Sequence, residues 1–300
     1  MKTESCAVLK PICMLIFALW IGNVAVAQEP SAPSPLVDRV GQTGFLQLEA
    51  ESFKNLSRQQ KVLAHWLSMA AIALNPIVYD QNSAYGLELK HLLEQILTHA
   101  HGIDPAVLKK LTDYTKLFWA NHGNHNTFTS QKFLPDFTFE ELQAAAEQAL
   151  KNRARLGPRT KLAKELADLR PAIFDADYQP YLTVKNPKNG EDPLAASGNN
   201  LYQGVTMSDL ADFHDKYPLN SRLIKKHGKL IEQVYRAGTP DGKVPSGLYA
   251  DELNRVIRYL TMALPYAEAP KKAGSAGSNP LLPDRRPRRL AAVQHRLGAR

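Results

Sequence analysis

His122 and His125 lie three residues apart in a polar stretch, Asn121–Phe137, that reads NHGNHNTFTSQKFLPDF. Imidazole nitrogens are frequent zinc ligands, so the pair could form half of a metal site. The glycine and asparagines around the two histidines favour a loop, in which this spacing does not place two side chains on one face. A stable zinc site also needs three or four protein ligands. We therefore expect the pair to shape a loop, with weak zinc binding as the alternative.

Other polar clusters give no stronger sign of catalysis. Glu140 and Glu141 are adjacent carboxylates, but they fall in the first turn of an expected helix, where the helix dipole favours acidic residues anyway. Asp175 and Asp177 could bind calcium, although a turn is favoured because the spaced oxygen ligands of a calcium loop are missing. None of the nine histidines is followed by glutamate. The zinc-peptidase motif H-E-x-x-H is therefore absent from this sequence, as are G-x-S-x-G and a glycine-rich phosphate loop.

Two further groups of residues have both a functional and a structural interpretation. His91 and His99 lie beside an apolar stripe, Leu89–Leu97, and we expect boundary histidines rather than metal ligands. Five aromatic residues could line a peptide groove or pack a sheet, and the sequence favours neither. They are Phe174, Tyr178, Tyr181, Tyr202 and Tyr235.

The first 27 residues predict an export signal. An apolar run over residues 11–22 follows two lysines, and Ala25-Val26-Ala27 matches the small-residue pattern at a signal-peptidase cut. The run is short for a membrane span, so a membrane anchor is the weaker alternative. Both cysteines lie inside this signal, so a mature chain starting at Gln28 has no disulfide and no thiolate ligand. We expect a periplasmic or secreted protein that is free of the membrane after cleavage.

The formal net charge of +8 is unevenly distributed. Residues 271–300 hold eight basic residues and one acidic residue, so they carry +7, and the signal carries +1. The body from Gln28 to Pro270 is neutral, and it gives no reason to expect a nucleic-acid partner. The tail itself could bind an anionic surface, could be a disordered stub, or could be an out-of-frame extension.

The first half of the sequence indicates a run of helices. Ser57 with Gln60, and Thr138 with Glu141, are predicted capping boxes, in which each side chain bonds the backbone of the other residue. Apolar spacing and end signals define the expected helices. They run from Ser57 to a stop at Asn75-Pro76, over Leu89–Leu97, from Asp104-Pro105 to Trp119, from Thr138 to about Leu150, and from Leu248 to Leu260 before Pro265.

After Arg170 the pattern changes to short runs bounded by proline, glycine and asparagine. YQPYLTVK (178–185) and NNLYQGVT (199–206) predict strands. The stretch 221–238 predicts a hairpin turning at His227-Gly228, with a helix from Leu230 to Arg236 as the alternative. Helices followed by a strand-rich segment indicate an α+β fold rather than an alternating α/β fold.

Six stretches, taken in order, carry a resemblance to a known family. They are VDRVGQTGFLQLEAESFKNLSRQQKVLAHWLSMAA, DYTKLFWANHGNHNTFTSQKFLPDFTFEEL, LADLRPAIFD, NLYQGVTMSDLADFHDKYPLNSRLIKK, VYRAGTPDGKVPSGLYADEL and ALPYAE. Together they resemble the N-terminal part of bacterial dipeptidyl peptidase III, a family of zinc exopeptidases, over roughly Pro35 to Glu268. In that family the segment matching residues 123–128 and 132–135 belongs to the scaffold, and His125 falls where relatives can carry tyrosine.

The resemblance implies a two-lobed protein that removes dipeptides from the N-termini of short peptides with a zinc-activated water. One lobe is helical and carries zinc, and the other mixes helices with a β-barrel. Residues 41–268 would belong to this second lobe, after the signal (1–27) and a linker (28–40). The family's His-Glu-x-x-Gly-His motif and its Glu-x-Tyr substrate strand are missing here, so no catalytic, metal or substrate residue is carried over. We expect an inactive chain without zinc, with a secreted, non-catalytic peptide-binding module as the alternative.

The resemblance stops after Glu268, and we expect residues 269–300 to be a disordered, out-of-frame tail. Relatives continue here with a stretch like RYYQTGDPADW. Codons can be chosen for PLLPDRRPRRL (280–290) so that a shift of one base reads as that stretch. The tail also lacks aromatic residues and has few apolar ones, so it offers little surface to offset the entropy of ordering. This composition is compatible with a frameshift that truncates a longer peptidase.

Overall fold

The structure is a computed structural model that describes residues 35–267. This range contains helices and two small sheets, which confirms the predicted α+β class. The β1–β2 hairpin belongs to one compact unit, and everything from Glu49 onward belongs to another. The predicted signal and basic tail lie outside the described residues.

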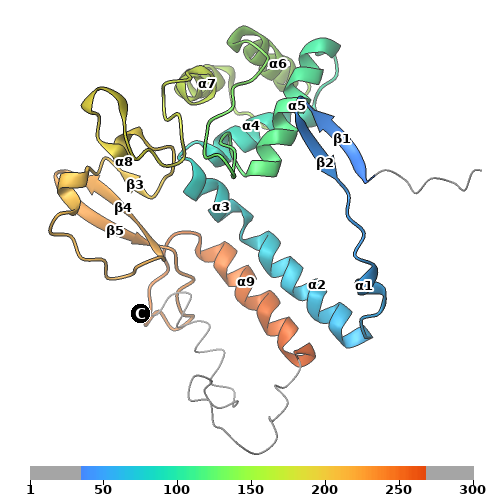
Figure 1. Cartoon of the computed structure of the whole chain (residues 1–300), viewed down its shortest axis with the longest axis vertical. Helices are drawn as coiled ribbons and strands as arrows, with labels where there is room; N and C mark the ends of the chain where they lie inside the picture. The colour runs from blue at the N-terminus through green and yellow to red at the C-terminus, as the bar shows by residue number, and fades with distance from the viewer. Residues whose placement is uncertain (1–34, 268–300) are drawn as a thin grey trace, which may run out of the picture. The chain divides into compact units, whose positions relative to one another are not determined.

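Helices dominate the second unit (Figure 1). The α-helices are α1 (Glu51–Lys54), α2 (Arg58–Ala73), α3 (Asn75–Asn82), α4 (Gly86–Thr98), α5 (Pro105–Asn121), α6 (Phe139–Lys151), α7 (Arg159–Phe174), α8 (Pro193–Ala196) and α9 (Ala250–Ala263). Short 3-10 turns cover Lys188–Gly190, Met207–Leu210 and Leu264–Tyr266. The strands are β1 (Leu36–Val40), β2 (Thr43–Leu46), β3 (Tyr202–Gln203), β4 (Ser221–Lys226) and β5 (Lys229–Val234).

The first unit contains an antiparallel hairpin that the sequence analysis did not predict. β1 pairs with β2, with Val40 opposite Thr43 across a turn in which Gly41 has a φ of 54°. A positive φ is accessible to glycine without steric cost. β1 occupies the end of the expected linker over 28–40, so that linker prediction is wrong from Leu36 onward. The Leu-Val-Asp-Arg-Val run contains two valines, which favour strands, but it does not alternate between apolar and polar residues, so its pattern does not predict a strand.

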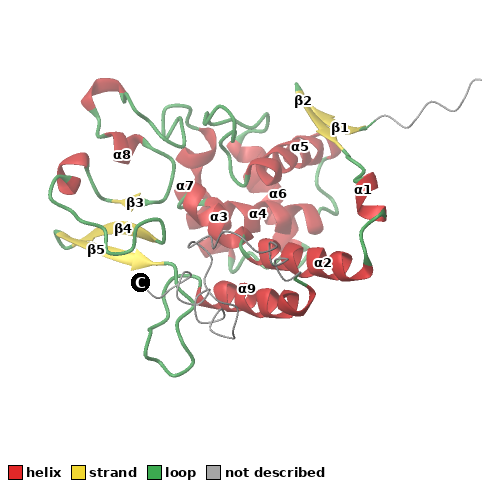
Figure 2. Cartoon of the chain, turned by 60° about the horizontal axis from the view of Figure 1, so that its bottom comes forward, coloured by secondary structure: helices red, strands yellow, loops and turns green. Residues whose placement is uncertain are grey.

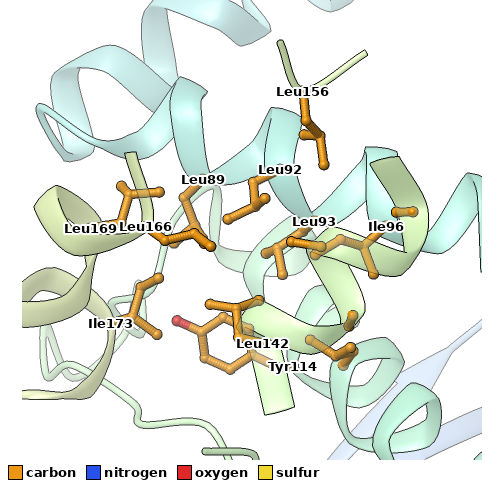
Figure 3. Packing of buried hydrophobic residues seen from close by; sticks show 14 of the residues in the cluster. Leu89, Leu92, Leu93, Ile96, Tyr114, Leu142, Leu156, Leu166, Leu169 and Ile173 are labelled. Carbon is orange, nitrogen blue, oxygen red and sulfur yellow. The ribbon is translucent and has the colours of Figure 1, made fainter. Parts of the chain in front are cut away.

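The main hydrophobic core lies between α4, α5, α6 and α7 (Figure 3). The side chains of Leu92, Leu142 and Leu169 are fully buried there. Burying one such leucine stabilises a fold by about 1.5–3 kcal/mol. The sequence analysis did not predict α7, although Leu162, Leu166, Leu169 and Ile173 recur at helical spacing and are all buried. Pro171 lies inside this helix, which continues to Phe174. The predicted change from helices to strands after Arg170 was therefore placed too early in the chain.

α2 and α9 pack side by side and antiparallel (Figure 2). Gln59, at the start of α2, donates to the carbonyl of Tyr266, 3.2 Å away, just after the end of α9. Further along, the rings of Trp66 and Tyr259 stack with centroids 6.1 Å apart. The predicted last helix is therefore confirmed, and its partner is the first long helix of the unit.

The helix predicted to stop at Asn75-Pro76 ends at Ala73, but the chain immediately starts another helix. Pro76 lies in the first turn of α3, where its missing N–H costs nothing. The combined stretch from Arg58 to Asn82 is long enough to cross a membrane and contains an 18-residue window with a mean hydropathy of 1.5. One helix that meets this test is weak evidence of a membrane span, because helices of soluble proteins meet it too.

The second sheet has the order β3-β4-β5. β4 and β5 form an antiparallel hairpin that turns at His227-Gly228, as predicted, and the alternative of a helix after Leu230 is wrong. The predicted strand YQPYLTVK is also wrong, since only Tyr181 makes ladder bridges, to Gln131 and Ser197. Pro180 has no N–H to donate to a ladder. Within residues 35–267 neither sheet closes on itself, so the barrel that the resemblance implies is not seen in this range.

Helix caps follow the prediction closely. Ser57 and Gln60 form a capping box at α2, Thr138 and Glu141 form one at α6, and Asp104 caps α5. These side chains satisfy backbone N–H groups that have no partner inside the helix.

We expect Thr138→Ala to lower the free energy of unfolding by about 1 kcal/mol, because the Thr138 hydroxyl accepts from the Glu141 N–H at 3.1 Å. Urea denaturation measures this loss. Thr112→Ala is the matched control, since the Thr112 hydroxyl bonds the Leu108 carbonyl inside α5 and caps nothing. Alanine is the better helix former there, so we expect little change. Equal losses in the two variants would show that the cap contributes nothing.

Candidate functional site

Buried polar side chains gather where the chain after α5 meets the loops that follow α7 and α8. We call this group the polar loop core, and it consists of Asn121, Asn124, His125, Lys132 and Ser197. Each of these side chains bonds a backbone group or a neighbouring polar atom. Buried polar groups are stable only when paired in this way, so the polar loop core can hold irregular backbone together.

His122 and His125 have different partners. His122 ends α5 with a φ of 51°, its carbonyl accepts from the Asn82 side chain at 3.1 Å, and its ring packs against Tyr79. His125 is buried, and its Nε2 lies 2.9 Å from the carbonyl oxygen of Gln179. This geometry supports the loop-shaping interpretation. In the part of the chain that the structure describes, no three His, Cys, Asp or Glu side chains come together to hold a metal ion.

Lys132 is the buried cation of the polar loop core. Its ammonium donates to the carbonyls of Asp175, at 3.0 Å, and Tyr178, and it lies 5.4 Å from the centre of the Tyr178 ring. Burial lowers the pKa of Lys132 to about 8, against the opposing effect of the Asp175 charge. Lys132 was not predicted as a site residue, because its carbonyl partners lie more than 40 residues further along the chain and no spacing rule connects them.

Asp175 and Asp177 form a turn, as favoured. The Asp175 carboxylate accepts from the backbone N–H groups of Asp177, at 2.9 Å, and Tyr178, at 3.3 Å. Asp177 pairs instead with Lys188 at the surface. An aspartate that bonds the backbone two residues ahead is the usual stabiliser of such a turn.

The five aromatic residues with an open role do not share one groove. Phe174 packs edge-on against Phe137 and Phe139 beside the main core, and Tyr178 bonds Tyr85 through the two hydroxyls. The other three lie in separate places. Tyr181 is exposed at its bridge, Tyr202 is exposed on β3, and Tyr235 is buried against Tyr249.

The remaining candidates occupy structural positions. Glu141 bonds Thr138 and pairs with Lys110 at 2.8 Å, whereas Glu140 is exposed. Both line a groove of ≈ 550 Å³ between α5 and α6. The ring nitrogens of His91 and His99 bond backbone carbonyls at 2.8 and 2.9 Å, which fits the expected boundary role.

A second buried polar network joins α3 to the three-stranded sheet and was also missed. Asp80 accepts from Asn200 at 3.1 Å, from Arg222 at 3.2 Å and from the Tyr235 hydroxyl at 2.9 Å. Burial and the Asp80 charge raise the pKa of Tyr235, and the same causes raise the pKa of Tyr249. The sequence shows an aspartate directly after the apolar residues Ile77, Val78 and Tyr79, but it does not identify the partners of Asp80.

This Asp80 network, made of Asp80, Asn200, Arg222, Tyr235 and Tyr249, has the residue types of a catalytic site. Its groups are, however, already bonded to one another. The guanidinium that faces Asp80 also donates to Gln233, and the raised tyrosine pKa values keep both phenols protonated. A substrate would have to break these bonds, so the network is suited to joining elements rather than to acid–base chemistry.

No family model matches the chain, and no curated protein matches its sequence.

Proposed function

We propose that the chain is the non-zinc lobe of a periplasmic or secreted, dipeptidyl peptidase III-like peptidase and does not itself hydrolyse peptides. The observation that carries this proposal is the resemblance of six stretches, in the same order, between Pro35 and Glu268. A match maintained in order over this length is more specific than any single motif. Hydrolysis by zinc needs at least three protein ligands and a base, and the family motif that supplies them does not occur in the sequence.

The positions of the histidines are consistent with this proposal. In the resembling family the segment around His125 belongs to the scaffold, and His125 bonds a backbone carbonyl of a neighbouring loop. The His125 ring is therefore engaged in holding the loops of the lobe together. Short peptides remain the substrate class of the parent enzyme under this proposal.

One observation favours the alternative of a non-catalytic peptide-binding module. The groove between α5 and α6 has an apolar wall that includes Ile103, Val107 and Ala145, and its charged lining consists of four carboxylates and the ammonium group of Lys151. Its volume lies in the range of small-ligand sites. A short peptide with a basic residue would fit such a groove, and saturable peptide binding weakened by Val107→Asp would support the module.

We expect the purified chain from Gln28 to hold no tightly bound zinc and to release no dipeptide from a short peptide with a free N-terminus. The measurements are metal analysis and chromatography of the digest, with added zinc and with an active zinc dipeptidyl peptidase assayed alongside. The absence of the ligand motif is the reason. One zinc per chain that is lost in His122→Ala/His125→Ala would overturn this expectation and make the loop a metal site.

A further inference from the structure

Three separate segments meet around His125. Lys132 donates its N–H to the Pro180 carbonyl, at 2.8 Å, and Leu182 donates to Ser130, at 2.8 Å. Gly198 in turn donates to the carbonyl of Tyr181, at 2.9 Å. These backbone bonds hold the segment after α7 between the segment after α5 and the segment after α8. Two further bonds join the same segments, since the Asn199 side chain donates to the Leu182 carbonyl at 2.7 Å and the Val184 N–H donates to the Ser197 hydroxyl at 2.9 Å.

The His125 ring lies at the centre of this junction and has no room to move. Only 3 % of the residue is exposed, and Nε2 faces the Gln179 carbonyl at 2.9 Å. A Cβ placed on Gly198 would lie 2.7 Å from Cε1 of the ring, so the backbone of Gly198 packs directly against the imidazole. A neutral imidazole satisfies this environment, because one N–H suffices for the Gln179 carbonyl.

The charges near His125 oppose a second proton. Lys132 is buried and lies directly opposite His125 in an isolated antiparallel β-bridge. The Asp175 carbonyl accepts from Lys132, and its carboxylate accepts from backbone N–H groups. The Asp177 carboxylate forms an ion pair with Lys188. Among residues 35–267 no carboxylate hydrogen-bonds the His125 ring.

We propose that protonation of His125 in mild acid opens this junction and releases the segment from Asp175 to Asn199. We call the junction the His125 clasp, defined by His125, Lys132, Gln179, Tyr181 and Gly198. The clasp is closed while the imidazole is neutral and opens when a second cation must be accommodated beside Lys132. This inference goes beyond the proposed function and does not depend on it.

The direction of the pH dependence follows from linkage. Burial lowers the pKa of His125 below its ordinary value of 6.5; the hydrogen bond to the Gln179 carbonyl opposes this effect, and the Lys132 charge adds to it. The open state therefore binds more protons than the closed state below about pH 6.5. Stability of the closed clasp is complete above that pH and is lost as the pH falls toward the lowered pKa. In this window each pH unit multiplies the open population by up to about tenfold.

Amide hydrogen exchange at residues that close the clasp tests the proposal. The N–H groups of Leu182, Gly198 and Asn199 report opening, and those of Leu92 and Leu93 in α4 serve as an internal reference. Protection factors, which divide out the intrinsic pH dependence of exchange, should fall for the clasp between pH 7 and pH 5 by up to about tenfold per unit. The reference protection factors should stay constant over the same range. Clasp protection that is constant across this range would overturn the proposal.

Two variants and one titration complete the test. His125→Gln keeps an N–H donor but cannot titrate, so its clasp protection should lose the pH dependence. His91→Gln is the matched control, since His91 also bonds a backbone carbonyl but lies at the surface, and it should behave like the unmodified chain. If His125→Gln does not fold, an NMR titration of the His125 ring in the unmodified chain decides. A native pKa at or above 6.5 would contradict the clasp.

Discussion

Replacing Asp80 with alanine should lower the free energy of unfolding by about 3–5 kcal/mol. The side chains of Asp80 and Arg222 are only 12 and 15 % exposed, so the variant leaves a buried guanidinium without its counter-charge. It also removes the acceptor of the Asn200 amide and the Tyr235 hydroxyl. Unpaired buried donors each cost more than the bond itself contributed. Urea or thermal denaturation followed by circular dichroism measures the loss.

A second variant separates the pair from its surroundings. Asp80→Ala/Arg222→Met removes both charges, and we expect it to recover part of the loss, since a buried ion pair replaced by apolar side chains is often nearly neutral. Asp168→Ala is the surface control, because its pair with Lys164 is exposed, and it should cost no more than about 0.5 kcal/mol. If Asp80→Ala costs no more than Asp168→Ala, the network does not join α3 to the sheet.

Phe118→Ala should also destabilise the chain by about 3–5 kcal/mol, through the cavity it leaves in the main core. Phe118 is 1 % exposed and stacks on Tyr79, with ring centroids 5.6 Å apart. The cavity would lie at the end of α5, next to the turn made by His122. Denaturant unfolding measures this loss. Circular dichroism before unfolding checks that the variant retains its secondary structure.

Phe128→Ala is the matched control for this substitution. Phe128 is 97 % exposed in the loop that follows His125, so its loss should stay within about 0.5 kcal/mol. A large loss at Phe128 would mean that this ring is covered by something outside residues 35–267. Similar losses at both positions would contradict the description of the core.

Features that depend on local chemistry could be predicted from the sequence. The capping boxes at Ser57 and Thr138, the Asp104 cap and the turn at His227-Gly228 all form as expected, because each depends on residues no more than a few positions apart. The α+β class followed from the order of helical and strand patterns. The resemblance to dipeptidyl peptidase III is a hypothesis. It rests on six sequence stretches in the same order and not on any of these physical patterns.

Features that depend on distant partners could not be predicted. YQPYLTVK has strand-forming residues but finds bridging partners only at Tyr181, and α7 forms despite Pro171 because its leucines have a core to fill. Lys132 and Asp80 acquire their roles only when the chain brings carbonyls and cations from far along the sequence against them. The candidate residues named from the sequence were mostly found in turns, caps and boundaries.

The proposed function is tested most directly by the DNA that follows the codon for Glu268. The resemblance to dipeptidyl peptidase III ends there, and the residues beyond it become basic and poor in apolar side chains. We expect another reading frame to continue through Gln-Thr-Gly-Asp-Pro and later to encode His-Glu-x-x-Gly-His. A stop codon soon after Glu268 in both other frames, with neither stretch encoded, would contradict it and leave the basic tail as a genuine part of the protein.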